Sequence, residues 1–126
     1  MKLLDLFHGW NDVVEYPAKT VVFSERDPAD VMYIILSGEV ELSLRGEPLG
    51  AEAEGGMFGE MAMINSATRS ATATTISKVK LARLNRDQFK DIVTNNIEFS
   101  LHVMAVLANR LRALDNFITM QFANRK

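Results

Sequence analysis

Short apolar runs, many of them β-branched or alternating with polar residues, fill residues 13–84 and are separated by Gly, Pro, Asn and Asp. Several such runs in succession predict antiparallel strands folded into a sandwich or barrel. We place Pro28 and Pro48 in loops, where a missing backbone donor is harmless, and interpret Ser37 and Gly38 as a tight hairpin turn. The clearest predicted strands are residues 20–23, 31–37, 40–44, 70–75 and 79–84.

Helical spacing of apolar residues replaces the strand pattern at both ends of the chain. Residues 1–12 are predicted as a short amphipathic N-terminal helix. Residues 85–126 are predicted as C-terminal helices, with Asn85 capping the first and Asn95 and Asn96 separating it from a longer one. We therefore expect one α+β domain over residues 1–126, an antiparallel β jelly-roll or barrel flanked by an N-terminal helix and by C-terminal helices, the last one long.

The last helix carries a three-four spacing of apolar residues that is typical of a coiled-coil seam. Because the helix is longer than a small barrel can cover, we expect it to form a homodimer. The alternative is a helix packed on its own β domain. The residues of the seam are Ile97, Met104, Leu107, Leu111, Leu114 and Ile118.

Composition excludes several classes of function. A net charge of −2 offers no general attraction to nucleic acid or to anionic membranes, and the absence of cysteine excludes disulfides and thiolate chemistry. No apolar run approaches the length of a membrane span and no signal peptide is visible, so we expect a cytoplasmic protein without a membrane role. His8 and His102 lie on separate helices, and no catalytic triad context is present, so no metal, cofactor or catalysis is expected.

Residues 55–71 contain the candidate ligand-binding groups of the sequence. Three glycines precede a predicted single helical turn at residues 60–64, whose first amides are free to bind an anion. Arg69 follows, and its planar guanidinium can bind two phosphate oxygens side by side. The segment contains no lysine, which disfavours a polyphosphate.

Glu60 lies in the same segment and would repel a ligand that is only negative. A carboxylate there indicates a ligand that also offers hydroxyl donors, and a ribose phosphate does so. The alternative is that Glu60 and Arg69 form an internal ion pair that holds a loop to a strand.

Residues 58–62, Phe-Gly-Glu-Met-Ala, followed by residues 69–71, Arg-Ser-Ala, resemble the phosphate-binding cassette of the cyclic-nucleotide-binding domain family. Residues 32–40 are similar to the hairpin that precedes this cassette, and residues 81–89 resemble the strand and helix that follow it. The long last helix resembles the family's C-helix.

The resemblance implies a role for each residue of the cassette. Glu60 would accept the ribose 2'-hydroxyl, and Arg69 would pair with the exocyclic phosphate oxygens. Ser70 would contact the phosphate or a syn guanine, and Ala71 would line the pocket. The backbone amides of the anion cradle would come from Gly59, Met61 and Ala62.

Two departures from the family affect what is expected. The family's transcription regulators continue into a helix-turn-helix, whereas this sequence stops at Lys126, so direct DNA binding is not expected. Leu114 and Asp115 stand where those regulators place hydroxyl residues that meet the base.

The resulting hypothesis is a sensor or regulatory module that binds a cyclic nucleotide, with cyclic AMP favoured over cyclic GMP, and signals to an unidentified protein partner. One alternative is a scaffold that dimerises without responding to ligand. Another is a regulatory fragment of a channel, kinase or transcription factor.

Overall fold

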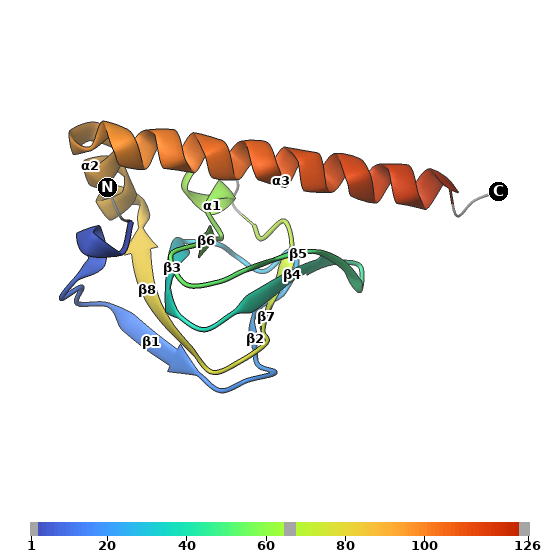
Figure 1. The fold of residues 1–126 in the computed structure, drawn as a ribbon, viewed down its shortest axis with the longest axis horizontal. Coiled ribbons are helices and arrows are strands. Elements are labelled where there is room, and N and C mark those ends of the chain that lie inside the picture. The colour runs from blue at the N-terminus through green and yellow to red at the C-terminus, as the bar shows by residue number, and fades with distance from the viewer. Residues whose placement is uncertain (1–2, 65–67, 124–126) are drawn as a thin grey trace.

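Two four-stranded antiparallel sheets face each other in this computed structural model, which describes residues 3–64 and 68–123. A long helix crosses the open end of this β-roll (Figure 1). The strands are β1 (Val13–Tyr16), β2 (Val21–Phe23), β3 (Val31–Ser37), β4 (Val40–Leu44), β5 (Glu47–Glu52), β6 (Met57–Phe58), β7 (Thr72–Thr75) and β8 (Val79–Asn85). The helical elements are a 3-10 helix (Leu3–Phe7), α1 (Met61–Ile64), α2 (Arg86–Asn95) and α3 (Ile97–Ala123).

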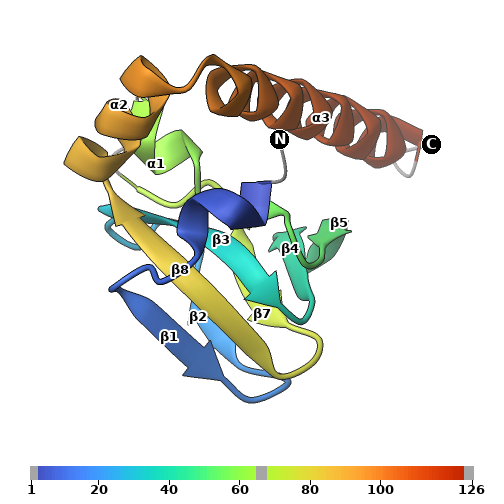
Figure 2. The same cartoon turned by 60° about the vertical axis from the view of Figure 1, so that its left-hand side comes forward.

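The order of strands confirms the α+β prediction of a jelly-roll-like fold but corrects one turn. One sheet has the order β1-β8-β3-β6 and the other β2-β7-β4-β5, so β3 and β4 belong to different sheets (Figure 2). The turn at Ser37 and Gly38 is therefore not a hairpin, and Gly38, with φ of 91°, carries the chain from one sheet to the other. Two apolar runs joined by a short connection have the same sequence pattern whether they pair in one sheet or lie in two sheets.

The prediction that Pro48 lies in a loop is wrong, because Pro48 lies in β5 opposite Ser43. β5 stands at the end of its sheet, where a residue without an N–H group is tolerated. Pro28 forms only an isolated bridge with Thr68. Strands β1, β5 and β6 lie within residues 13–84 but outside the clearest predicted strands. β6 has only two residues, and β5 contains both Pro and Gly, which weaken a strand pattern.

The N-terminal helix is shorter than the predicted residues 1–12. It is a 3-10 helix that ends at Phe7, and Met1 and Lys2 lie outside the described residues. Gly9, with φ of 72°, turns the chain out of the helix. The indole nitrogen of Trp10 then donates to the carbonyl of Arg83 at 2.8 Å, which fixes the chain against β8 before β1 begins.

The predicted start of the C-terminal helices is confirmed. Asn85 caps α2 by accepting from the amide of Gln88, and the Gln88 side chain accepts in return from the Asn85 amide, a reciprocal capping box. Asn96 then separates α2 from α3, which has 27 residues. Within the described ranges, no helix is both long enough and apolar enough to cross a membrane.

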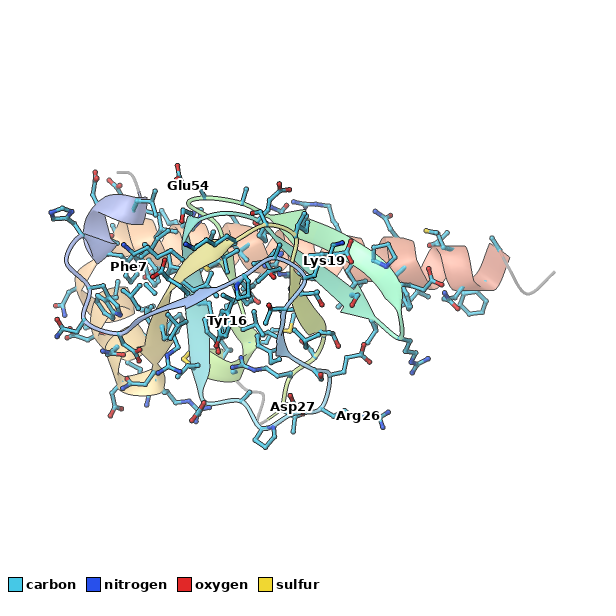
Figure 3. The ribbon with its side chains drawn as sticks, turned by 90° about the horizontal axis from the view of Figure 1, so that it is seen from below. Phe7, Tyr16, Lys19, Arg26, Asp27 and Glu54 are labelled. Carbon is cyan, nitrogen blue, oxygen red and sulfur yellow. The ribbon has the colours of Figure 1, made fainter. Side chains whose placement is uncertain are left out.

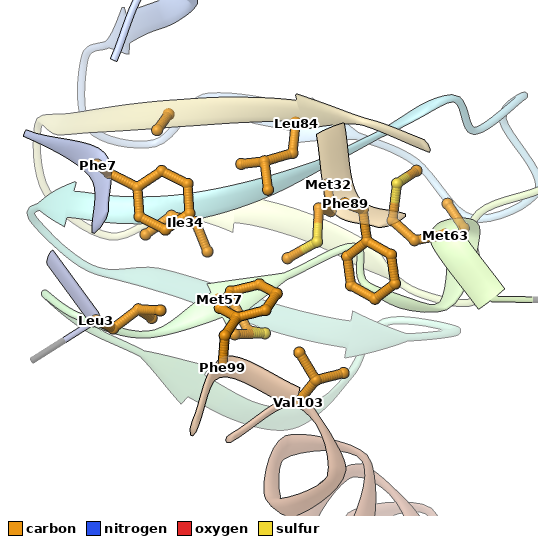
Figure 4. Close-up of a cluster of buried hydrophobic side chains, with 12 residues drawn as sticks. Leu3, Phe7, Met32, Ile34, Met57, Met63, Leu84, Phe89, Phe99 and Val103 are labelled. Atoms are coloured by element: carbon orange, nitrogen blue, oxygen red, sulfur yellow. The ribbon is translucent and has the colours of Figure 1, made fainter. Parts of the chain in front are cut away.

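A single apolar cluster ties the helices to the roll (Figure 4). It joins the 3-10 helix, β3, β6, β8, α1, α2 and the first turns of α3, where Phe99 and Val103 are buried. The cluster fixes α1 and the base of α3 against the sheet that contains β3, β6 and β8. Its members are Leu3, Phe7, Met32, Ile34, Met57, Ala62, Met63, Ala82, Leu84, Phe89, Phe99 and Val103.

Candidate functional site

A cavity of about 210 Å³ lies between the roll and α3, more than ten times the space that one water molecule requires. All seven predicted site residues line it: Gly59, Glu60, Met61, Ala62, Arg69, Ser70 and Ala71. The cavity is completed by Asn109, Arg110, Ala113 and Leu114 of α3, by 49–52 of β5, and by Phe23, Leu42 and Thr68.

The cassette has the local structure that its sequence predicts. Strand β6 ends at Phe58, and the single turn of α1 begins two residues after Gly59. Met63 donates its amide to Glu60 at 3.0 Å, while the Ala62 amide makes a longer bond of 3.3 Å to Gly59. The amide of Ala62, one of the predicted cradle donors, is thus already engaged, though weakly.

Gly59 is required by a close approach. It has φ of 77°, and a Cβ atom at this position would lie 2.8 Å from Nη1 of Arg69. Any other residue would displace the guanidinium or strain the backbone. The glycine therefore allows Arg69 to lie directly against the main chain of the cassette.

Arg69 presents a buried guanidinium with unused donors. Arg69 is 7% exposed, and its Nε and Nη1 atoms have no hydrogen-bond partner among the residues that the structure describes. Cζ lies 4.1 Å from the centre of the Phe23 ring and 5.7 Å from that of Tyr33, so the aromatic faces hold the cation in place. Burial lowers the pKa of Arg69, which means that its charge is poorly solvated and that an anion would be strongly stabilised there.

The backbone around Arg69 is fixed by the loop that precedes β3. The Arg69 amide donates to the Asp27 carbonyl at 2.9 Å, and the Arg26 amide donates to the Arg69 carbonyl at 2.8 Å. These paired bonds extend the bridge between Pro28 and Thr68. They hold the arginine in position independently of its side chain.

The alternative of an internal Glu60–Arg69 ion pair is wrong. Glu60 is 3% exposed and accepts instead from Nη2 of Arg110 at 3.2 Å. Burial raises the pKa of Glu60, and the charge and hydrogen bond of Arg110 oppose this shift. The two charged groups of the cassette are thus separately placed, with the carboxylate turned to α3 and the guanidinium stacked on the sheet.

Arg110 is a charged residue of the site that could not be identified from the sequence. Its Nη1 donates to Oε1 of Glu52 at 2.7 Å, and its Nη2 donates to the Met57 carbonyl at 2.6 Å as well as to Glu60. The sequence offers one weak signal, a charged residue beside the apolar seam. Arg112 gives the same signal but is exposed, so the pattern does not distinguish the two.

The remaining predicted positions are Ser70, Ala71, Leu114 and Asp115, of which the first three line the cavity. Ser70 is exposed and its hydroxyl donates to Sδ of Met61 at 3.4 Å, while Ala71 is half-buried. Of the two positions expected near a base, Leu114 lines the cavity. Asp115 is exposed and is not part of the lining.

Comparison with known proteins gives one family. A family model described as the cyclic nucleotide-binding domain matches residues 13–96. A curated relative, the CRP-like cAMP-activated global transcriptional regulator of Mycobacterium tuberculosis, is 35% identical over 109 residues, which cover 82% of this chain and 48% of the relative. The chain thus spans about half the length of that relative.

Solved structures agree with this result. The catabolite activator protein of Thermus thermophilus superposes with a TM-score of 0.75 at 26% identity, covering 94% of this chain and 58% of that one. The EAL enzyme Bd1971 superposes with a TM-score of 0.62 in a cAMP-bound form, at 33% identity over 90% of this chain and 33% of the enzyme. Its cGMP-bound form gives the same TM-score at 31% identity, over 90% of this chain and 35% of the enzyme. Together with the position of the cassette in the β-roll, these matches show that the chain belongs to the cyclic nucleotide-binding domain family.

Proposed function

We propose that the chain binds a cyclic nucleotide in the cavity between the roll and α3 and acts as a ligand-responsive regulatory module. The observation that carries this proposal is that Arg69 has two buried donors without a partner among the described residues, in a cavity that the buried Glu60 also lines. A buried guanidinium with unused donors costs free energy that a phosphate would offset. A carboxylate that lines the same cavity suits a ligand with both a phosphate and a hydroxyl.

In this proposal the cassette residues contact different parts of the ligand. Arg69 binds the exocyclic phosphate oxygens, and the cradle amides come from Gly59, Met61 and Ala62. Glu60 accepts the ribose 2'-hydroxyl. Ser70 and Ala71 lie at the mouth, where the hydroxyl of Ser70 can turn from Met61 to the ligand.

The proposal extends to the identity of the base. We favour cyclic AMP, because the Mycobacterium tuberculosis relative is a cAMP-activated regulator. The two forms of Bd1971 indicate that a related fold accepts both cyclic AMP and cyclic GMP. The side of the cavity formed by Ala113 and Leu114 offers apolar contact, which suits the face of either purine.

The response to ligand follows from the position of α3. Because α3 supplies one wall of the cavity, a ligand that contacts Arg110 and Leu114 interacts differently with different positions of the helix. A partner protein would read the new helix position. The proposed role is binding without turnover, in the cytoplasm, with no cofactor.

Isothermal titration with cyclic AMP, cyclic GMP and linear AMP tests the proposed function. We expect saturable binding of a cyclic form at micromolar concentration or tighter, with linear AMP bound far more weakly. Absence of heat with all three nucleotides would reject nucleotide binding and favour the scaffold alternative.

The outer face of α3 supports a proposed homodimer. Within the predicted seam, Leu107 and Leu114 are half-buried against the chain's own roll and cavity. The other four seam residues recur every seven positions and are exposed, at 75% for Ile97 and 69% for Leu111. We call this set the outer stripe: Ile97, Met104, Leu111 and Ile118. Apolar residues at this spacing on a projecting helix suit a second copy of the same helix.

Substitution Leu111→Glu is expected to weaken the dimer by roughly tenfold or more, because a symmetric interface would bury the new charge twice. Sedimentation equilibrium measures the dissociation constant. Asn116→Glu adds the same charge on another face of α3 and should leave the dimer intact. A wild-type protein that sediments as a monomer at high concentration would contradict the proposed dimer.

A further inference from the structure

Arg110 bridges two carboxylates of the β-roll, and only one of them belongs to the cassette. Nη1 donates to Glu52 at 2.7 Å and Nη2 donates to Glu60 at 3.2 Å. The shorter contact is thus made with the residue outside the cassette. The Glu52 side chain is 28% exposed, and that of Arg110 is 15% exposed, so water only partly screens the pair.

The position of the Glu52 carboxylate is fixed by the turn that follows β5. The Gly56 amide donates to the Ala53 carbonyl at 2.8 Å, and Ile35 of β3 exchanges backbone hydrogen bonds with Gly55 and Gly56, each 2.9 Å long. A Cβ atom on Gly56 would lie 2.7 Å from Oε2 of Glu52. Glycine at this position therefore lets the carboxylate lie against the turn, where it faces α3.

The guanidinium of Arg110 transmits this position to Glu60. Because a guanidinium is planar and rigid, fixing Nη1 on Glu52 also fixes the direction in which Nη2 points. Nη2 then reaches both the Met57 carbonyl at 2.6 Å and Oε1 of Glu60. The Nε atom is buried and has no partner within the described ranges, so the two terminal nitrogens provide the anchoring.

We propose that Glu52 is a positioning residue that orients Arg110 so that Glu60 is held as an ionised acceptor for the ribose 2'-hydroxyl, and that Glu52 thereby sets selectivity for this hydroxyl. This inference rests on the proposed function of the cavity. It assigns to β5 a part in recognising the sugar, although Glu52 is eight positions before Glu60 and outside the cassette.

The charges around Glu60 agree with this role. Burial raises the pKa of Glu60 most strongly, the charge and hydrogen bond of Arg110 lower it, and the negative charge of Glu52 raises it least. Loss of Glu52 therefore has two opposite effects on Glu60. The loss of a well-placed Arg110 matters more, because its guanidinium contacts Glu60 directly at 3.2 Å, whereas Glu52 acts on Glu60 only from the far side of that guanidinium.

The test compares two ligands that differ by one hydroxyl, cyclic AMP and 2'-deoxy cyclic AMP, in wild-type protein and in Glu52→Gln. We expect wild-type protein to prefer cyclic AMP by about tenfold or more, the size of one charge-assisted hydrogen bond. In Glu52→Gln the preference should fall below about threefold, because cyclic AMP binds more weakly while the deoxy ligand is unaffected. Arg110→Lys keeps the charge but lacks the rigid planar fork that fixes the direction toward Glu60, so it should reduce the preference in the same way.

Glu54→Gln is the matched control. Glu54 lies two residues further along the chain and is exposed at the edge of the molecule (Figure 3), so the substitution removes the same charge without touching Arg110. It should keep the wild-type preference. The double variant of Glu52→Gln with Arg110→Lys should show no further loss, since Glu52 acts through Arg110.

The outcomes separate the two proposals. If wild-type protein binds neither ligand, the proposed function fails and this inference fails with it. If wild-type protein binds and discriminates but Glu52→Gln keeps the full preference, or weakens both ligands equally while remaining folded by circular dichroism, only the role of Glu52 is overturned.

Discussion

Replacing Arg69 by alanine is expected to weaken cyclic nucleotide binding by about 100-fold or more. The guanidinium can make two charge-assisted hydrogen bonds to one phosphate, and each is worth about 1.5–3 kcal/mol. No other cation is placed in the same way within the described part of the cassette, because Arg110 is engaged by two carboxylates. Isothermal titration with cyclic AMP measures the loss.

The same substitution should leave the fold intact. Alanine removes the stacking of Arg69 on Phe23, worth about 0.5–2 kcal/mol. It also removes two buried donors that have no partner in the part of the chain that the structure describes, and their desolvation costs a similar amount. Thermal unfolding without nucleotide should therefore differ little from wild type. Arg112→Ala, which removes an exposed arginine of α3, is the control and should bind normally. Unchanged affinity in Arg69→Ala would show that the phosphate site has been assigned to the wrong residue.

Replacing Phe99 by alanine is expected to lower the free energy of unfolding by about 3–5 kcal/mol. Phe99 is fully buried, and its ring centre lies 6.1 Å from that of Phe89 in α2 and 6.5 Å from that of Phe7 in the 3-10 helix. The alanine would leave a cavity where three helical elements meet (Figure 4). Such a loss is a large part of the stability of an ordinary domain.

Urea denaturation followed by far-UV circular dichroism measures this change. Leu101→Ala alters the same helix at an exposed position and should change the free energy of unfolding by less than about 0.5 kcal/mol. A loss below about 1 kcal/mol in Phe99→Ala would mean that the cluster at the base of α3 contributes little to folding. α3 would then need another anchor.

The elements that depend on neighbouring residues could be predicted from the sequence. The capping box at Asn85 needs only Gln88, and the single turn of α1 needs only the residues that follow Gly59. The cassette could be recognised because its cavity-lining side chains lie within residues 59–71. The structure then brings these residues to one cavity.

Features that depend on distant residues could not be predicted. Glu60 meets Arg110 across 50 positions of the chain, and Glu52 meets it across 58. Nothing local distinguishes Arg110 from Arg112, because the choice depends on how α3 is rotated over the roll. The same reason explains the seam, whose Leu107 and Leu114 turn inward once the roll is in place.

Because the start of α3 is buried in the apolar cluster, a small tilt of the helix produces a larger displacement further along it. Phe99 and Val103 are buried near its start, whereas its far end projects beyond the roll (Figure 1). From Phe99 to Ala123 the helix spans about 36 Å, at ~1.5 Å per residue. A tilt of about 10° around this buried start would displace Ala123 by roughly 6 Å, because a hydrogen-bonded helix moves as a rigid rod. A small change in tilt near Arg110 would thus become a larger displacement at Ala123.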